Sequence, residues 1–185
     1  MFPKTGHMEC VVLMSKNINF QCFNKDVRRE LMNLRKVSID DFELLIRLRI
    51  DYLIEDRGSI SQDEKQKIEL QLRDYFPKHI SDGTFIGVVA EEDNKVISVA
   101  FLSISEKPAN PAFITGKTGT LLNVHTYSQY RRKGIATKVI MRIIEEARSC
   151  GVSYIDLSAT SDGKPLYKKL GFNESKYTAM GIKLI

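Results

Sequence analysis

The segment from Leu121 to Ala147 constrains the fold of this 185-residue chain more than any other. Strand-like residues end at Thr126, a polar stretch follows, and an apolar stripe begins at Ala136. The members of this stripe are three or four positions apart, which places them on one face of an α-helix: Ala136, Val139, Ile140, Ile143, Ile144 and Ala147. A strand that passes through a short polar loop into an amphipathic helix predicts a layered protein in which helices cover a sheet.

The segment 42–54 carries conflicting signals. Its alternate positions are apolar, which is the period of a strand. Thirteen residues is long for a strand, however, and Ser38 with Asp41 resembles a helix cap. Charges of opposite sign also recur at a spacing of four. We therefore predict a helix that protein covers on more than one side.

The remaining elements follow from local patterns. Strands are expected at 34–37, on either side of a tight turn at Asp93–Asn94, at 118–126, at 153–158 and at 172–184. Helices are expected at about 62–76, where Pro77 should end the helix, and at 164–170. The order β-α-α-β-β-β-α-β-α-β predicts an α/β or α+β fold with a mixed sheet.

Composition limits the class of protein and its partners. The length predicts one domain, at 32–185, after an N-terminal extension, 1–31, that contains a possible hairpin and receives no function. The three cysteines lack the spacing of a zinc site, and no apolar run is long enough to span a membrane, so we expect a cytoplasmic protein without a metal. The net charge of +5 indicates an anionic partner, with nucleic acid, membrane and phosphate-bearing molecules still open.

The loop before the stripe is a candidate anion site. The first N–H groups of a helix have no internal partners, and the helix dipole adds positive charge there. Gly134 removes a Cβ from this point, Thr137 offers a hydroxyl, and Arg131, Arg132 and Lys133 add charge. A solvated basic turn is the alternative. The loop matches neither the P-loop pattern nor the dinucleotide-binding glycine pattern.

Two blocks resemble the GNAT superfamily of acyl-CoA-dependent N-acetyltransferases. "RRKGIA" resembles its Q/R-x-x-G-x-G/A signature, and "LSATSDGKPLYKKLGF" resembles a second block that ends in Leu-Tyr-x-x-x-Gly-Phe. The blocks occur in the family's order, and the resemblance covers Asn33 to about Ile185. It implies a mixed, mostly antiparallel central sheet flanked by helices.

The resemblance also implies acetyl-CoA as cofactor and assigns residues to it. Backbone N–H groups of the loop would bind the pyrophosphate, with Arg131 at the Q/R position. The central strand would splay at a bulge and pair with the pantetheine arm and the thioester carbonyl, where an N–H group would stabilise an oxyanion. The residues concerned are Val124, His125, Thr126, Arg131, Arg132, Lys133, Gly134, Ile135, Ala136 and Thr137, together with Thr160 and Tyr167 from the second block.

Catalytic roles are open to alternatives. Tyr167 matches the family's tyrosine that protonates the departing thiolate, and its place within "LYKKLGF" favours this role over the alternative of a core aromatic residue. His125 could accept the amine proton through water, or simply be a packed residue. Asn123 could orient substrate or water. The central strand contains no glutamate, so the general base is undetermined.

The acceptor is predicted only in outline. In the family, the first two helices and the 105–117 loop usually shape its pocket. Asp51, Tyr52 and Glu55 are candidate acceptor residues, although this stretch could also be a solvated helix end. We expect a small-molecule primary amine, with a peptide or protein amine, or a non-catalytic acyl-CoA sensor, as alternatives. A homodimer stays open, and neither nucleic acid nor membrane is expected as a partner.

Overall fold

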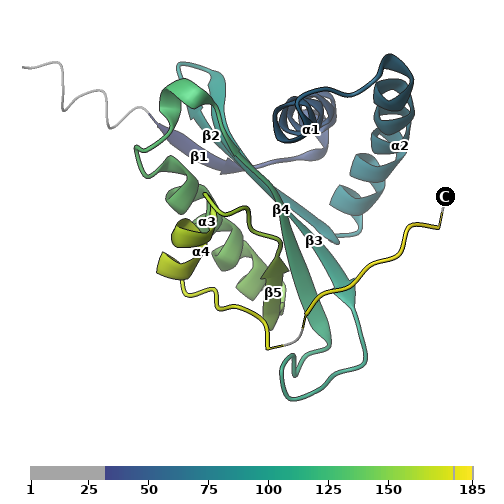
Figure 1. Cartoon of the computed structure of the whole chain (residues 1–185), viewed down its shortest axis with the longest axis vertical. Helices are drawn as coiled ribbons and strands as arrows, with labels where there is room; N and C mark the ends of the chain where they lie inside the picture. The colour runs from purple at the N-terminus through teal and green to yellow at the C-terminus, as the bar shows by residue number, and fades with distance from the viewer. Residues whose placement is uncertain (1–31, 177, 185) are drawn as a thin grey trace, which may run out of the picture. The chain divides into compact units, whose positions relative to one another are not determined.

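Five strands form one sheet, in the order in which they occur along the chain (Figure 1). The structure is a computed structural model that describes residues 32–176 and 178–184. Neighbouring strands are antiparallel except for the last pair, which is parallel. The strands are β1 (Asn33–Lys36), β2 (Phe85–Glu92), β3 (Lys95–Glu106), β4 (Lys117–Thr126) and β5 (Tyr154–Leu157). The prediction of a mixed, mostly antiparallel sheet is confirmed.

Helices cover both faces of this sheet (Figure 1). Helices α1 (Phe42–Arg57) and α2 (Gln62–Ser81) pack on one face. Helix α3 (Ile135–Ser149) packs on the other, with the short α4 (Lys164–Lys169) beside it. Single 3-10 turns at Ile39–Asp41 and Ser128–Tyr130 precede α1 and α3.

Strand β2 supplies both cores, which explains why its apolar run is nearly continuous. Ile86 and Val88 point into the core under α3, whereas Phe85 and Val89 point into the core under α1 and α2. Alternate residues of a strand face opposite sides of the sheet, so a sheet covered on both faces needs apolar residues at every position.

The helix predicted at 42–54 is confirmed as α1. The Ser38 N–H donates to Asp41 Oδ2 at 2.8 Å, and Gly58 ends the helix with φ of 79°. Its buried side chains spread over more than half of the helix circumference at 100° per residue: Leu45, Ile46, Leu48, Ile50 and Leu53. This wide buried surface produced the strand-like alternation in the sequence.

The prediction that Pro77 ends the second helix is wrong, because α2 continues to Ser81. Proline removes one N–H donor and so one helical hydrogen bond. That loss falls near the end of a helix which is anchored at Leu72 and Phe76 in the core and capped at its start by Ser61 and Glu64.

The tight turn at Asp93–Asn94 is confirmed, since both residues have positive φ, 51° and 59°. Two consecutive residues of this kind are typical of a two-residue hairpin turn.

The strand predicted at 172–184 is wrong, because the described residues there form neither helix nor strand. The alternating apolar residues Met180, Ile182 and Leu184 produced this prediction, yet they are 95%, 84% and 84% exposed. Without a core to cover, alternation alone does not hold a strand. The hairpin predicted within 1–31 lies outside the described residues. Of the helices that the structure describes, none is long and apolar enough to cross a membrane.

Candidate cofactor and acceptor site

Strand β4 separates from β5 at the point where it also bulges away from β3. Pairing with β5 stops at Leu121, while β4 continues to Thr126. On the other side, His125 pairs with Val99 but Leu122 pairs with Phe101, so two residues of β4 oppose one of β3. Asn123 has a φ of 54° in this bulge. The stretch that was predicted to splay, Val124 to Thr126, therefore has an edge without a strand partner.

The start of α3 offers unpaired N–H groups beside this edge. Gly134 is the N-cap residue with φ of 75°, and the space where its Cβ would be is open to at least 4 Å. The first α-helical hydrogen bond reaches Gly134 from Lys138, so the N–H groups of Ile135, Ala136 and Thr137 precede the helical ladder. The open space and the free donors fit a phosphate group.

The basic side chains of this loop have different surroundings. Arg132 and Lys133 are exposed, and the Lys133 ammonium lies 5.2 Å from the centre of the Tyr130 ring. Arg131 turns away from the loop: its Nε donates to the Thr126 carbonyl at 2.7 Å, and its Nη2 is hydrogen-bonded to Glu55. Arg131 therefore links the end of β4 to α1, and it occupies a carbonyl that was predicted to be free for the cofactor.

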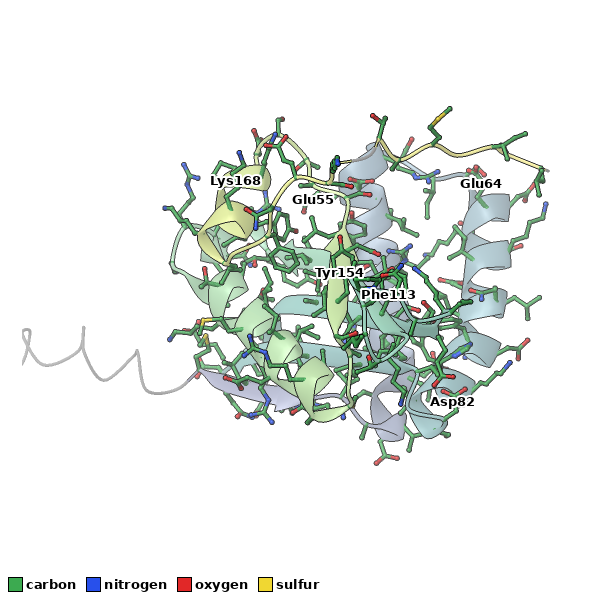
Figure 2. All side chains as sticks on the ribbon, turned by 90° about the horizontal axis from the view of Figure 1, so that it is seen from below. Glu55, Glu64, Asp82, Phe113, Tyr154 and Lys168 are labelled. Atoms are coloured by element: carbon green, nitrogen blue, oxygen red, sulfur yellow. The ribbon has the colours of Figure 1, made fainter. Side chains whose placement is uncertain are left out.

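His125 is buried, with 5% of its side chain exposed, and faces α1. Its Nε2 lies 2.9 Å from Oε2 of Glu55, which comes from the last turn of α1 and is labelled in Figure 2. Desolvation opposes the charge of Glu55, but hydrogen bonds from His125 and Arg131 outweigh it and lower the pKa of this carboxyl. An ionised carboxylate only accepts hydrogen bonds, so Nε2 carries a proton, and in the neutral imidazole Nδ1 is then the ring's acceptor.

Two buried polar atoms beside α1 have no hydrogen-bond partner among the described residues: Nδ1 of His125 and Nδ2 of Asn123. Unsatisfied buried polar groups are rare in folded proteins and call for an explanation. Here one is an acceptor and the other a donor, and they belong to the same short stretch of β4. Residues 123–125 can therefore hydrogen-bond a polar group.

Arg49 of α1 is a site residue that sequence reasoning missed. Its Nη1 donates to Asn123 Oδ1 at 3.2 Å, and its guanidinium lies 5.6 Å from the centre of the Tyr52 ring. Desolvation lowers the pKa of this half-buried guanidinium. Arg49 and Asn123 are 74 positions apart in the sequence, so no local sequence pattern predicts their contact.

The predicted acceptor residues of α1 lie together beside His125. Tyr52 approaches the imidazole edge-on at 6.4 Å between ring centres, and Glu55 is bonded to it. Asp51 accepts a hydrogen bond of 2.7 Å from the Tyr127 hydroxyl, whose own ring lies 4.8 Å from that of His125. Desolvation and the bond to Asp51 raise the pKa of Tyr127 to about 12.

Tyr167 lies half-buried in α4, at an edge-to-face distance of 5.9 Å from Phe172. Desolvation, and less strongly the nearby Tyr52, raises the pKa of its hydroxyl, so the group stays protonated at neutral pH. Thr160 Oγ1 accepts from the Gly163 N–H at 3.1 Å. Thr160 thus shapes the turn that leads into α4.

The 105–117 loop lies at the other end of β4 from the groups gathered around His125 and Asn123. It leads into the start of β4, where Phe113 packs against Tyr154 of β5 (Figure 2) and Thr115 donates to the Gly151 carbonyl. Strand residues advance by about 3.3 Å each, so the length of β4 separates the loop from the bulge at Asn123. The expectation that this loop shapes the acceptor pocket stays a prediction.

Comparison with known proteins was made on the sequence and on the fold. The model of the acetyltransferase (GNAT) family matches residues 45–172, which include the bulge, the α3 loop and α4. The chain belongs to the GNAT acetyltransferase family. Sequence reasoning predicted this membership from the α3 loop and the α4 block.

Individual relatives agree with this membership. Glucosamine 6-phosphate N-acetyltransferase of Arabidopsis thaliana is 25% identical over 150 residues, which are 78% of this chain and 91% of the relative. The crystal structure of a predicted acetyltransferase with acetyl-CoA from Clostridium acetobutylicum superposes with a TM-score of 0.70 at 30% identity, covering 81% and 96% of the two chains. A GCN5-related N-acetyltransferase from Ralstonia eutropha gives 0.68 at 26% identity, covering 82% and 98%.

In this GNAT acetyltransferase, two sets of groups lie near the end of β4, one on each face of the sheet. Backbone N–H groups gather at the start of α3. Side chains of α1 gather around His125 and Asn123 on the opposite face of the sheet. The geometry thus offers one place for an anion and another for a group that exchanges protons.

Proposed function

We propose that this protein transfers an acetyl group from acetyl-CoA to the primary amine of a small molecule, by direct attack in a ternary complex. One observation carries the proposal: the stretch Val124–Thr126 of β4, which β5 leaves unpaired, contains the buried His125 and leads into the loop before the open start of α3. A cofactor held along this edge has its phosphates at the helix start and its reactive end near a base. Acetyl-CoA, when bound, supplies an acetyl group activated as a thioester.

The chain holds the cofactor mainly through its backbone. The N–H groups from Arg132 to Thr137 bind phosphate oxygens, because they carry partial positive charge and have no helical partners. Arg132 and Lys133 neutralise further negative charge. Val124 and its neighbours direct peptide groups toward the edge that β5 leaves free. Thr160, from the turn before α4, and Tyr167, from α4, line the far side.

His125 acts as the general base. Its Nδ1 accepts the proton that the acceptor amine loses, directly or through one water molecule, because Nε2 already donates to Glu55. The negative charge of Glu55 stabilises the imidazolium that forms. Asn123 Nδ2, the unpaired donor nearby, orients the same water or the acceptor itself.

Tyr167 acts as the general acid. Its hydroxyl hydrogen-bonds the sulfur of the departing thiolate and donates a proton to it, which is slightly uphill because the pKa of a thiol, near 8.5, lies below that of a phenol, near 10. Burial keeps the phenol protonated until the charge on sulfur develops. The half-buried position in α4 also limits the access of water to this end of the site.

A small-molecule acceptor is favoured over a peptide by the crowding around His125. Tyr52 and Tyr127 pack against the imidazole, and both orphaned polar atoms are buried. The relative named as a glucosamine 6-phosphate N-acetyltransferase also supports an acceptor of this size. A bulky peptide that displaced a hydrogen-bonding partner from the two buried polar atoms would leave these atoms unpaired.

A panel of amines scored by CoA release tests the proposal. The panel contains amino acids, amino sugars, polyamines and short peptides, each with saturating acetyl-CoA. We expect release well above the rate of spontaneous hydrolysis for at least one small amine. Release with peptides alone would point to a peptide acceptor, and acetyl-CoA binding without release for any amine would identify a sensor.

A further inference from the structure

We propose that Arg49 binds an oxyanion of the acceptor, so that the accepted amine also carries a carboxylate or a phosphate. The inference rests on the proposed function and names the chemical class of its acceptor. It starts from the position of Arg49 on α1, facing the bulge of β4 that also presents His125.

The charge of Arg49 is not neutralised by the protein. Its contacts are the Asn123 amide oxygen and the face of the Tyr52 ring, and no carboxylate of the described residues lies within ion-pair distance of it. The residue is nevertheless only partly exposed. A guanidinium in this situation gains more from an anion than one that is fully hydrated.

Two carboxylates of the same helix, Asp51 and Glu55, are already engaged. Asp51 accepts from Tyr127, and Glu55 accepts from both His125 and Arg131. Asp56 acts on Arg49 only as a charge at longer range. Arg49 is therefore a positive charge that faces the bulge and has no carboxylate partner among the described residues.

A second donor points to the same ligand. Asn123 is 2% exposed, and its Oδ1 accepts from Arg49, which fixes the orientation of the amide. Its Nδ2 is left as a buried donor without a partner among the described residues. Arg49 and Asn123 together present N–H groups and no free acceptor, which is the complement of an oxyanion.

Matched amine pairs test the proposal. β-Alanine is compared with β-alaninamide, and phosphoethanolamine with ethanolamine, on wild type, Arg49→Met and Arg47→Met. Met keeps the length and apolar contacts of the side chain. Arg47 is exposed on the same helix, so its variant removes an equal charge outside the site.

We expect the anionic member of an accepted pair to have the higher kcat/KM by tenfold or more. Arg49→Met should reduce this preference about tenfold to hundredfold, through KM rather than kcat, and Arg47→Met should preserve it. Which pair responds distinguishes carboxylate from phosphate. A preference for the neutral members, or an equal loss for both members in Arg49→Met, would overturn the proposal.

A binding measurement decides the matter if none of the four amines is accepted. With CoA saturating, so that the α3 loop is filled, sodium phosphate should raise the melting temperature of wild type and Arg47→Met by about 1–3 °C over equal ionic strength of sodium chloride. Arg49→Met should show no such rise, and an equal rise in all three proteins would overturn the proposal. Failure of acetyl-CoA to stabilise wild type would instead refute the proposed function.

Discussion

The two halves of the proposed site, one for the cofactor and one for the acceptor, use different chemical groups: backbone N–H groups in the first and side chains in the second. The proposed cofactor half, at the start of α3, consists of consecutive residues whose backbone N–H groups precede the helical hydrogen bonds, with open space at the Cβ position of Gly134. The acceptor half, between α1 and β4, consists of side chains that meet across 70 or more positions of sequence, as Glu55 and His125 do. The first half depends on conformation and the second on the identity of particular side chains.

The two halves therefore differ in how strongly their function depends on particular side chains. Backbone N–H groups are present whatever the side chains are, so a loop of this conformation can bind an anion in many different sequences. Arg49, Glu55 and His125 have no such substitute, because their hydrogen bonds and charges vanish with the side chain. We therefore expect the cofactor half to set affinity for acetyl-CoA and the acceptor half to set turnover and specificity.

The largest effect is expected from Gly134→Asp, which places a carboxylate against the phosphates. The affinity for acetyl-CoA, measured by calorimetry, should fall by at least 100-fold. Gly151→Asp is a matched control, since Gly151 also has positive φ, 77°, with open space, but lies at the other end of α3. Equal affinities for the two variants would remove the loop from cofactor binding.

His125→Gln should lower kcat about 100-fold at neutral pH, because the base is lost. The affinity for acetyl-CoA should stay within threefold of wild type if the two halves are separate. His79→Gln, in α2 beside Thr84, serves as the control for removing a histidine. A His125→Gln enzyme with full turnover would exclude His125 as the base.

Tyr167→Phe should lower kcat by about tenfold to hundredfold while leaving the cofactor affinity unchanged. The thiolate must then leave without a proton from the protein. Tyr154→Phe removes a hydroxyl from an exposed tyrosine at the start of β5 and should have no effect. Stopped-flow measurement of the chemical step checks this, and an unchanged rate would assign Tyr167 to packing alone.

The smallest effect is expected from Glu55→Gln on stability. The folded-state pKa of Glu55 lies below its ordinary value of 4.5, so its stabilisation is present above that pH and is lost as the pH falls through the lowered value. The variant should melt about 2 °C below wild type at pH 7, and the difference should vanish in acid. Glu145→Gln, on the exposed face of α3, should melt like wild type at both pH values. A difference that persists in acid would mean that the charge of Glu55 is not its source.

The cofactor half could be predicted from the sequence because its determinants are neighbours in the chain. Gly134 and the apolar stripe from Ala136 to Ala147, which together span fourteen residues, predict the loop and the helix that follows it. The acceptor half could not, since Arg49 reveals its role only through Asn123 on a distant strand. Local signals also gave two wrong predictions. Pro77 was expected to end α2, but the helix continues because it packs on the core. The alternation around Met180 was expected to form a strand, but these residues are exposed and cover no core.

The melting temperature of the wild-type protein with and without acetyl-CoA tests the central claim most directly. A ligand that binds only the folded state at 100 times its Kd adds about 2.7 kcal/mol of stability, or about 5–10 °C for a chain of this size. We predict a rise of this order with acetyl-CoA. An unchanged melting temperature at millimolar acetyl-CoA would contradict the account.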